Sequence, residues 1–193
     1  RPLGTFFHSG GPVVAECLAA AGLDFIVIDT EHGPFDLESS IEYIRAAKMH
    51  GMSPFMRIKD HTRSSILKAL DCGAEDIVVP FVDTVDQVKY LVECAKYYPL
   101  GRRGIVYART SGYGSADFAQ NPLEYFEICN RETLLLPQCE TVGCLEHIEE
   151  IVNIPGVDGI FVGPYDLSID MGIPAEFDNP RHVAAMDRIL KAC

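Results

Sequence analysis

Short apolar runs rich in valine, isoleucine and phenylalanine alternate along the chain with segments whose apolar residues recur at helical spacing. This alternation is typical of parallel strands joined by crossover helices, because parallel neighbours need a long return segment. We predict six strands, near residues 3–7, 25–29, 54–58, 76–80, 133–140 and 158–162. The sequence therefore predicts an α/β fold built on a parallel sheet.

Helical periodicity is clearest in two segments between these strands. One apolar face is expected on each, formed by Leu37, Ile41, Ile44 and Ala47 in the first and by Val85, Val88, Leu91, Val92 and Ala95 in the second. Thr84 and Gln87 have the spacing of a capping box at the start of the second helix. The glycine-rich stretch 97–120 is too polar for a buried element and is expected to be a functional or interface loop.

A (β/α)8 TIM barrel needs eight strands, and the helical pattern from Pro180 to Cys193 ends where a seventh strand is due. We therefore expect residues 1–193 to form a single (β/α) barrel domain, truncated after the sixth strand and its following helix, with strands 7 and 8 missing.

Composition excludes several classes of protein. The chain has 16 basic and 28 acidic residues and a net charge of -12, which disfavours binding to nucleic acid. Its seven cysteines form no Cys-x-x-Cys pair, so neither a disulfide framework nor a zinc ribbon is indicated. No signal peptide or membrane span is recognisable. A cytoplasmic location without membrane association is expected.

Polar residues at the carboxyl ends of parallel strands face the active-site mouth of such a barrel. The second predicted strand ends in Asp29, Thr30, Glu31 and His32. A hydrogen bond donated by the His32 ring to Asp29 would fix the tautomer and raise the basicity of the ring, as proton abstraction next to a carbonyl requires. The alternative is a helix-initiating turn with an exposed His32. His8, which follows the first strand beside two glycines, receives no assignment.

The third strand carries Arg57, whose guanidinium suits bidentate capture of a carboxylate or enolate oxygen. It could equally pair with a buried acid. In the fifth strand, alternation places Gln138 and Glu140 on one face and leaves Cys139 as a thiol within the core. Asp166 follows the sixth strand. Glu140 and Asp166 together suit a hard divalent ion, Mg or Mn, although Asp166 could be only a helix-start acid.

These positions and their flanking motifs resemble the HpcH/HpaI aldolase family along nearly the whole chain. The motifs are Gly4-Thr5-Phe6, Asp29-Thr30-Glu31-His32, Arg57, Leu70-Asp71-Cys72-Gly73-Ala74, Val79-Pro80, Gly101-Arg102-Arg103-Gly104, Gln138-Cys139-Glu140-Thr141 and Val162-Gly163-Pro164-Tyr165-Asp166-Leu167-Ser168. The family comprises metal-dependent class II pyruvate aldolases, including 2,4-dihydroxyhept-2-ene-1,7-dioate and 2-dehydro-3-deoxyglucarate aldolases.

The resemblance implies a role for each of these residues. His32 would be the proton acceptor supported by Asp29, Arg57 would stabilise the transition state, and Glu140 and Asp166 would hold a divalent metal, Mg or Mn, with Co or Zn as alternatives. Gln138 and the backbone at Tyr165 and Asp166 would contact substrate. Asp71 would raise the basicity of the catalytic histidine across a subunit boundary, which implies a homo-oligomer, commonly a hexamer. Tyr165 replaces a smaller residue of many members and would narrow the substrate pocket.

The expected reaction is reversible cleavage of a 4-hydroxy-2-oxo acid to pyruvate and an aldehyde through a metal-stabilised enolate. Three alternatives stay open. Lys59, two residues after Arg57 in the same predicted inward register, could form a Schiff base. A CoA-thioester lyase of the citryl or malyl type would share the fold. The third alternative is a non-catalytic barrel that binds 2-oxo acids.

Overall fold

The computed structural model describes residues 1–193 and contains one sheet of six parallel strands arranged in sequence order. The strands are β1 (Gly4–Phe7), β2 (Phe25–Asp29), β3 (Ser53–Arg57), β4 (Asp76–Val79), β5 (Leu134–Cys139) and β6 (Phe161–Val162). The predicted α/β class and all six strands are confirmed. Only β6 is much shorter than predicted, because regular pairing with β5 is limited to Phe161 and Val162.

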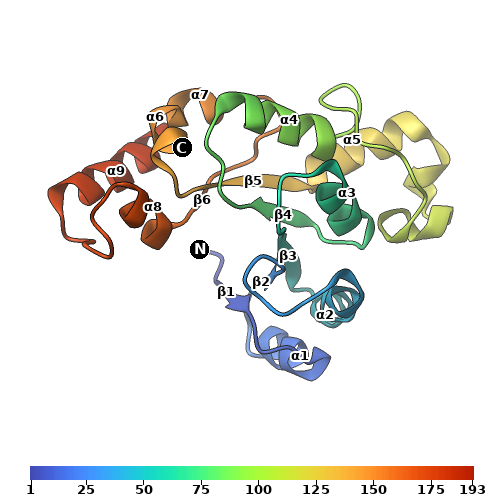
Figure 1. Cartoon of the computed structure of the whole chain (residues 1–193). Coiled ribbons are helices and arrows are strands. Elements are labelled where there is room, and N and C mark those ends of the chain that lie inside the picture. Colours follow the sequence, from blue (N-terminus) through green and yellow to red (C-terminus); the bar gives the residue numbers. More distant parts are fainter.

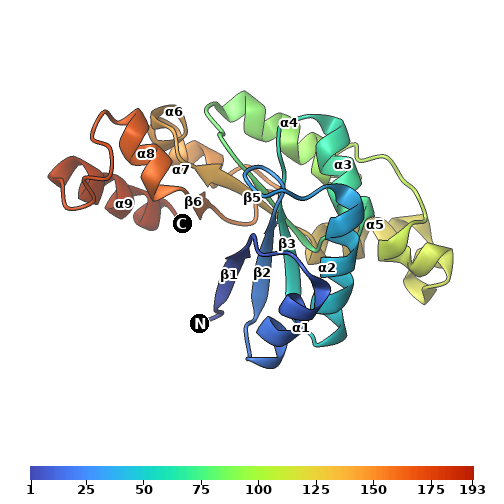
Figure 2. The same ribbon diagram turned by 60° about the horizontal axis from the view of Figure 1, so that its bottom comes forward.

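Helices follow the strands and cover the outer side of the curved sheet (Figures 1 and 2). They are α1 (Pro12–Ala20), α2 (Leu37–Met49), α3 (Arg63–Asp71), α4 (Val85–Ala95), α5 (Pro122–Glu132), α6 (Val142–Glu146), α7 (Ile148–Ile151), α8 (Pro164–Asp170) and α9 (Pro180–Ala192), with the 3-10 helices η1 (Arg109–Gly114) and η2 (Asp117–Gln120). The sheet curves enough for Phe6 of β1 to meet Phe161 of β6 edge to face, with ring centroids 5.7 Å apart. The six strands therefore form a half-barrel.

Side-chain alternation divides the sheet into two chemically different faces. Ile26, Ile28 and Met56 point outward and join the main hydrophobic core beneath the helices. The opposite, concave face carries Asp29 at the end of β2 and Arg57 at the end of β3, which are register partners. The concave face therefore presents charged groups at the carboxyl ends of the strands, as the alternation predicted.

Helix starts follow the capping chemistry of the sequence. The predicted capping box of Thr84 and Gln87 begins α4, and a second box that we did not predict, Asp36 with Ser39, begins α2. These caps fix where the chain leaves each strand end and enters the helix layer. All seven cysteines are free, which agrees with the absence of a disulfide framework. None of the helices combines the length and the apolar character that crossing a bilayer would require.

The stretch 97–120 was expected to be a functional or interface loop too polar for a buried element, but part of it is buried. Tyr97 is buried and, with Ala119 and Tyr125, forms a second small core to which Phe126 is stacked at 4.8 Å from the Tyr97 ring. Among the tyrosines of the stretch only Tyr97 is buried, with its ring against Tyr125, whereas Tyr98, Tyr107 and Tyr113 are exposed. Gly112 and Gly114 have positive φ angles, 57° and 83°, within η1.

A buried ionic cluster closes the amino-terminal end of the sheet. The Lys96 amine donates to Asp158 Oδ2 at 2.7 Å and to the carbonyl oxygen of Thr133 at 2.5 Å. Asp76, at the start of β4, accepts from the Leu134 amide at 3.0 Å. Burial, reinforced by Glu75 and Asp158, raises the pKa of Asp76 to about 7, although the Leu134 amide and Lys96 act in the opposite direction.

This pKa predicts how stability depends on pH. The folded chain holds the Asp76 proton up to about pH 7, whereas an unfolded chain releases it near the ordinary pKa of 3.8, so Asp76 lowers the free energy of unfolding as pH rises between these values. Asp76→Asn keeps the acceptor for Leu134 and removes the titration. Between pH 5 and 8 the free energy of unfolding, measured with urea, should fall by roughly 1 to 3 kcal/mol more in the parent than in the variant. Parallel pH profiles would contradict the assignment.

Candidate active site

Four of the predicted site residues lie where the strands end on the concave face. Asp29 and Arg57 are the last residues of β2 and β3, Glu140 follows β5, and Asp166 lies in the first turn of α8 after β6. Their charges interact: Glu140 contributes to raising the pKa of Arg57, and Asp166 to raising that of Glu140. Four of the predicted residues therefore belong to one electrostatic cluster.

Arg57 and Asp29 form a buried, two-pronged ion pair. Arg57 Nε donates to Asp29 Oδ1 at 2.9 Å, and Nη2 donates to Oδ2 at 2.6 Å. Burial opposes the charge of Asp29, but the hydrogen bonds from Arg57 and His8 outweigh it and hold the pKa of Asp29 well below its usual range. The third guanidinium nitrogen, Nη1, lies 3.2 Å from Glu31 Oε2. Arg57 therefore pairs with a buried acid, the alternative considered for it, and its Nη1 faces a second acid, Glu31.

The turn after β2 sets the direction of His32. Asp29 Oδ1 accepts from the backbone amides of Glu31 at 3.1 Å and of His32 at 3.3 Å. A Cβ at Gly33 would collide with the Asp29 carbonyl oxygen, so this tight turn requires glycine. The turn directs the His32 ring outward, with its side chain 69% exposed and Nε2 3.9 Å from Glu31 Oε2.

The prediction of a hydrogen bond between Asp29 and the His32 ring is therefore wrong. The Asp29 carboxylate instead accepts from His8 Nε2, at 2.6 Å from Oδ2. His8 is brought there because β1 and β2 are adjacent in the sheet and both end at the mouth. The only signal for His8 in the sequence was its position directly after a strand.

Glu140 is held by two donors from different parts of the chain. Its Oε1 accepts from the Phe81 amide at 2.6 Å, and its Oε2 accepts from Gln138 Nε2. Phe81 has φ 51°, a left-handed conformation that is strained for an aromatic residue and recurs at functional sites. Nothing in the sequence marked Phe81 as a site residue.

Gly163 leaves the space in which Glu140 and Gln138 sit. A Cβ at Gly163 would lie 2.5 Å from Glu140 Oε2 and 2.9 Å from Gln138 Nε2. Gln138 Oε1 is buried and has no hydrogen-bond partner. A buried acceptor without a donor is costly, so this oxygen is suited to a hydroxyl or water of a bound ligand.

The acids of the cluster have the chemistry of a divalent cation site. Burial raises the pKa of Glu140, and the nearby charges of Glu31 and Asp166 raise it further. Glu140 is buried, whereas Asp166 is exposed toward the mouth. No three His, Cys, Asp or Glu side chains are gathered as ligands. Two oxygen donors amid uncompensated negative charge fit a hard ion that completes its shell with water and substrate.

Tyr165 lies at the mouth beside Asp166. Its ring is exposed and meets the Phe177 ring edge to face, with centroids 4.7 Å apart.

Asp71 lies away from the mouth. It ends α3 at the opposite, amino-terminal end of the sheet, where it accepts a hydrogen bond from Arg103 Nη2 at 2.9 Å. Within one chain Asp71 is therefore remote from the other predicted residues. Its role across a subunit boundary stays a prediction.

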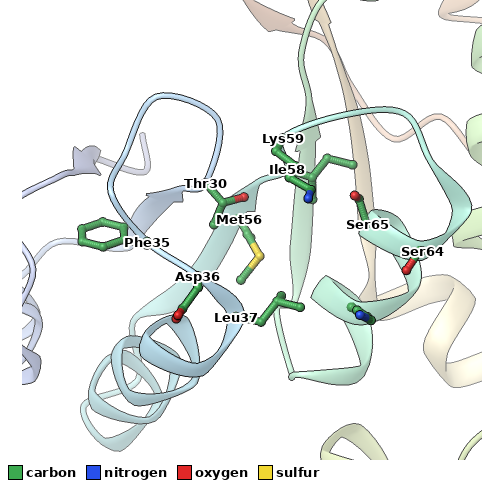
Figure 3. A pocket seen from close by; sticks show the side chains of 10 residues that line it. Thr30, Phe35, Asp36, Leu37, Met56, Ile58, Lys59, Ser64 and Ser65 are labelled. Atoms are coloured by element: carbon green, nitrogen blue, oxygen red, sulfur yellow. The ribbon is translucent and has the colours of Figure 1, made fainter.

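Lys59 does not share the inward direction of Arg57. It lines a cavity of about 300 Å³ outside the mouth, between the starts of α2 and α3, together with Thr30, Phe35, Asp36, Leu37, Met56, Ile58, Ser64, Ser65 and Lys68 (Figure 3). The predicted register fails because β3 ends at Arg57 and strand alternation stops there. The Schiff-base alternative thus lacks an amine in the charged cluster.

Comparison with known proteins places these residues in context. A family model described as HpcH/HpaI aldolase/citrate lyase matches residues 3–193. The 2-keto-3-deoxy-L-rhamnonate aldolase of Salmonella gallinarum (strain 287/91 / NCTC 13346) is 32% identical over 193 residues, which cover 99% of this chain and 68% of that protein.

Solved structures give the same picture of the fold. The crystal structure of an HpcH/HpaI aldolase from Desulfitobacterium hafniense DCB-2 superposes with a TM-score of 0.89 at 30% identity, covering 99% of this chain and 73% of that one. Citrate synthase SbnG superposes with a TM-score of 0.87 at 30% identity, covering 99% of this chain and 72% of that one. The half-barrel is therefore shared with an HpcH/HpaI aldolase and with a citrate synthase.

Proposed function

Because the chain belongs to the HpcH/HpaI aldolase/citrate lyase family, we propose that it is a divalent-metal-dependent, class II pyruvate aldolase, a carbon–carbon lyase. Its substrate class is the 4-hydroxy-2-oxo acids, which it cleaves reversibly to pyruvate and an aldehyde. The observation that carries this proposal is the joint presence, at one mouth, of a buried arginine and an electrostatically coupled pair of acids, Glu140 and Asp166.

Arg57 is the group that neutralises the developing enolate. Asp29 fixes the guanidinium through Nε and Nη2, so its orientation is set before substrate arrives. Nη1 remains directed to the side of Glu31 and is available to a carboxylate or enolate oxygen. A planar, preorganised cation of this kind stabilises negative charge without reorganising during the reaction.

Glu140 and Asp166 would hold the divalent ion, Mg or Mn. When bound there, such an ion supplies Lewis-acid stabilisation of the enolate formed from the 2-oxo acid. The Phe81 amide and Gln138 hold the Glu140 carboxylate in place, and the unpaired Gln138 Oε1 is free to bind a ligand hydroxyl or water. Tyr165 and Asp166 contribute further substrate contacts, and the exposed Tyr165 ring restricts the aldehyde end.

His32 takes the proton of the 4-hydroxyl during cleavage. Its ring is exposed, with Nε2 3.9 Å from Glu31 Oε2, and we assign it to the aldehyde half of the substrate. The curvature that joins Phe6 and Phe161 supports a complete (β/α)8 TIM barrel as the architecture of the active protein. We also propose that the protein is a homo-oligomer in which Asp71 raises the basicity of the catalytic histidine of a neighbouring subunit.

The direct test is pyruvate release from a series of 4-hydroxy-2-oxo acids with different aldehyde halves, measured through a coupled lactate dehydrogenase assay. We expect turnover with added Mg or Mn and loss of turnover after treatment with a chelator. Citryl-CoA and malyl-CoA are the comparison substrates. Cleavage of these thioesters alone would favour the CoA-lyase alternative, and absence of any cleavage or pyruvate binding would favour the non-catalytic one.

A further inference from the structure

His8 is held at the mouth by the same carboxylate that positions Arg57. Its Nε2 lies 2.6 Å from Asp29 Oδ2, and Asp29 is fully buried. Since Asp29 is ionised, the Nε2 nitrogen carries the hydrogen and donates it. The other ring nitrogen, Nδ1, has no hydrogen-bond partner in the chain. A neutral His8 therefore presents Nδ1 as a proton acceptor, and its side chain is 51% exposed.

The aromatic surroundings fix the ring as well. His8 stacks on Phe6 with centroids 5.8 Å apart, and the Arg57 guanidinium carbon lies 4.8 Å from the centre of the same Phe6 ring. Arg57 Nη2 and His8 Nε2 share one oxygen of Asp29. His8 is thus the imidazole beside Arg57, whereas His32 is 69% exposed and hydrogen-bonds Asp29 only through its backbone.

The proposed reaction needs proton transfer at two different atoms. Cleavage removes a proton from the 4-hydroxyl, the bond between carbons 3 and 4 breaks, and its electron pair stays in the enolate. Carbon 3 of that enolate must then receive a proton to give the methyl group of pyruvate. The two atoms belong to opposite halves of the substrate, so the two imidazoles can serve them separately.

We propose that His8, oriented by Asp29, exchanges the proton at carbon 3 of the pyruvate enolate, an inference that rests on the proposed aldolase function. In the cleavage direction the Nδ1–H bond of protonated His8 breaks and a carbon–hydrogen bond forms. In the synthetic direction Nδ1 takes the proton and the electron pair remains in the enolate. The half-exposed ring then equilibrates its proton with solvent. His32 serves the hydroxyl.

The experiment follows the exchange of the pyruvate methyl protons in D2O by NMR with the Mg-loaded protein. His8→Gln keeps an amide donor for Asp29 and removes the proton acceptor. We expect it to slow the exchange by about 10² to 10⁴-fold, the usual effect of losing a general base. His32→Gln should exchange at close to the parent rate while losing cleavage of the hydroxy acid. The matched control is His50→Gln, an exposed histidine at the end of α2.

A second variant separates proton transfer from a structural role. His8→Gly leaves space for added imidazole, which should restore a measurable part of the exchange. Exchange at the parent rate in His8→Gln would overturn the inference, as would loss of exchange in both variants without imidazole rescue. If the parent shows neither metal-dependent exchange nor cleavage, the proposed function itself fails, and that result is distinct from either outcome for His8.

Discussion

Arg57→Lys is expected to lose about 10² to 10³-fold in kcat/KM for aldol cleavage and about 1 to 3 kcal/mol in the free energy of unfolding. The lysine ammonium cannot reproduce the two parallel hydrogen bonds that Arg57 makes to Asp29 Oδ1 and Oδ2. The substitution also removes Nη1, the guanidinium nitrogen beside Glu31 that we assign to substrate. Coupled assays of pyruvate release and urea unfolding curves measure the two effects.

Arg102→Lys is the matched control for this substitution. Arg102 makes a surface ion pair with Glu93, with an Nη1 to Oε1 distance of 3.0 Å, and its side chain is 83% exposed. Exposed pairs contribute little, so this variant should stay within about 0.5 kcal/mol of the parent. Parent-like turnover and pyruvate affinity in Arg57→Lys would show that Arg57 serves only to neutralise Asp29.

The fold was largely predictable because several of its strands are continuous apolar runs, and β4 is buried on both faces. All four residues of β4 are buried, and such runs are conspicuous in sequence. The Thr84 cap of α4 was also predictable from the sequence, since a capping box depends on two residues three positions apart. The second core around Tyr97 was not predictable in the same way, because it depends on long-range contact between tyrosines separated along the chain.

The site was predictable only where strand alternation applied. It placed Asp29, Arg57 and Glu140 on the concave face, but it failed for Lys59, which lies beyond the end of β3. The partner of Asp29 was missed for a related reason. Which of two histidines meets the carboxylate depends on the turn after β2 and on the pairing of β1 with β2, and neither is visible as a local motif.

The second large effect is expected at the acids. Glu140→Gln and Asp166→Asn each remove one anionic ligand at nearly constant size, so the fold should survive while metal-dependent cleavage is lost. Glu140→Gln should also lower the electrostatic repulsion that Glu31 and Asp166 exert at this buried position. Loss of a supporting group alone typically costs a metal site 10 to 100-fold in affinity, so loss of a ligand should cost at least about tenfold.

Calorimetric titration of Mn into each variant, with and without oxalate, measures this directly. Oxalate presents two adjacent carboxylate groups as an analogue of the pyruvate enolate, and it should tighten Mn binding to the parent. Linkage requires Mn to tighten oxalate binding by the same factor. Both variants should lose most of this coupling, because the ion and oxalate depend on the same incomplete set of protein ligands.

Glu124→Gln provides the control, since Glu124 is an exposed acid in the first turn of α5, as Asp166 is in α8. It changes net charge and a helix-start acid without touching the mouth, so Mn affinity and oxalate coupling should match the parent. If Glu140→Gln and Asp166→Asn bind Mn as the parent does, or if chelator-treated protein retains full activity, the metal assignment is wrong. Arg57 would then have to stabilise the enolate without a metal ion. Of the substitutions discussed, Arg57→Lys alone would then remove electrostatic stabilisation of the enolate.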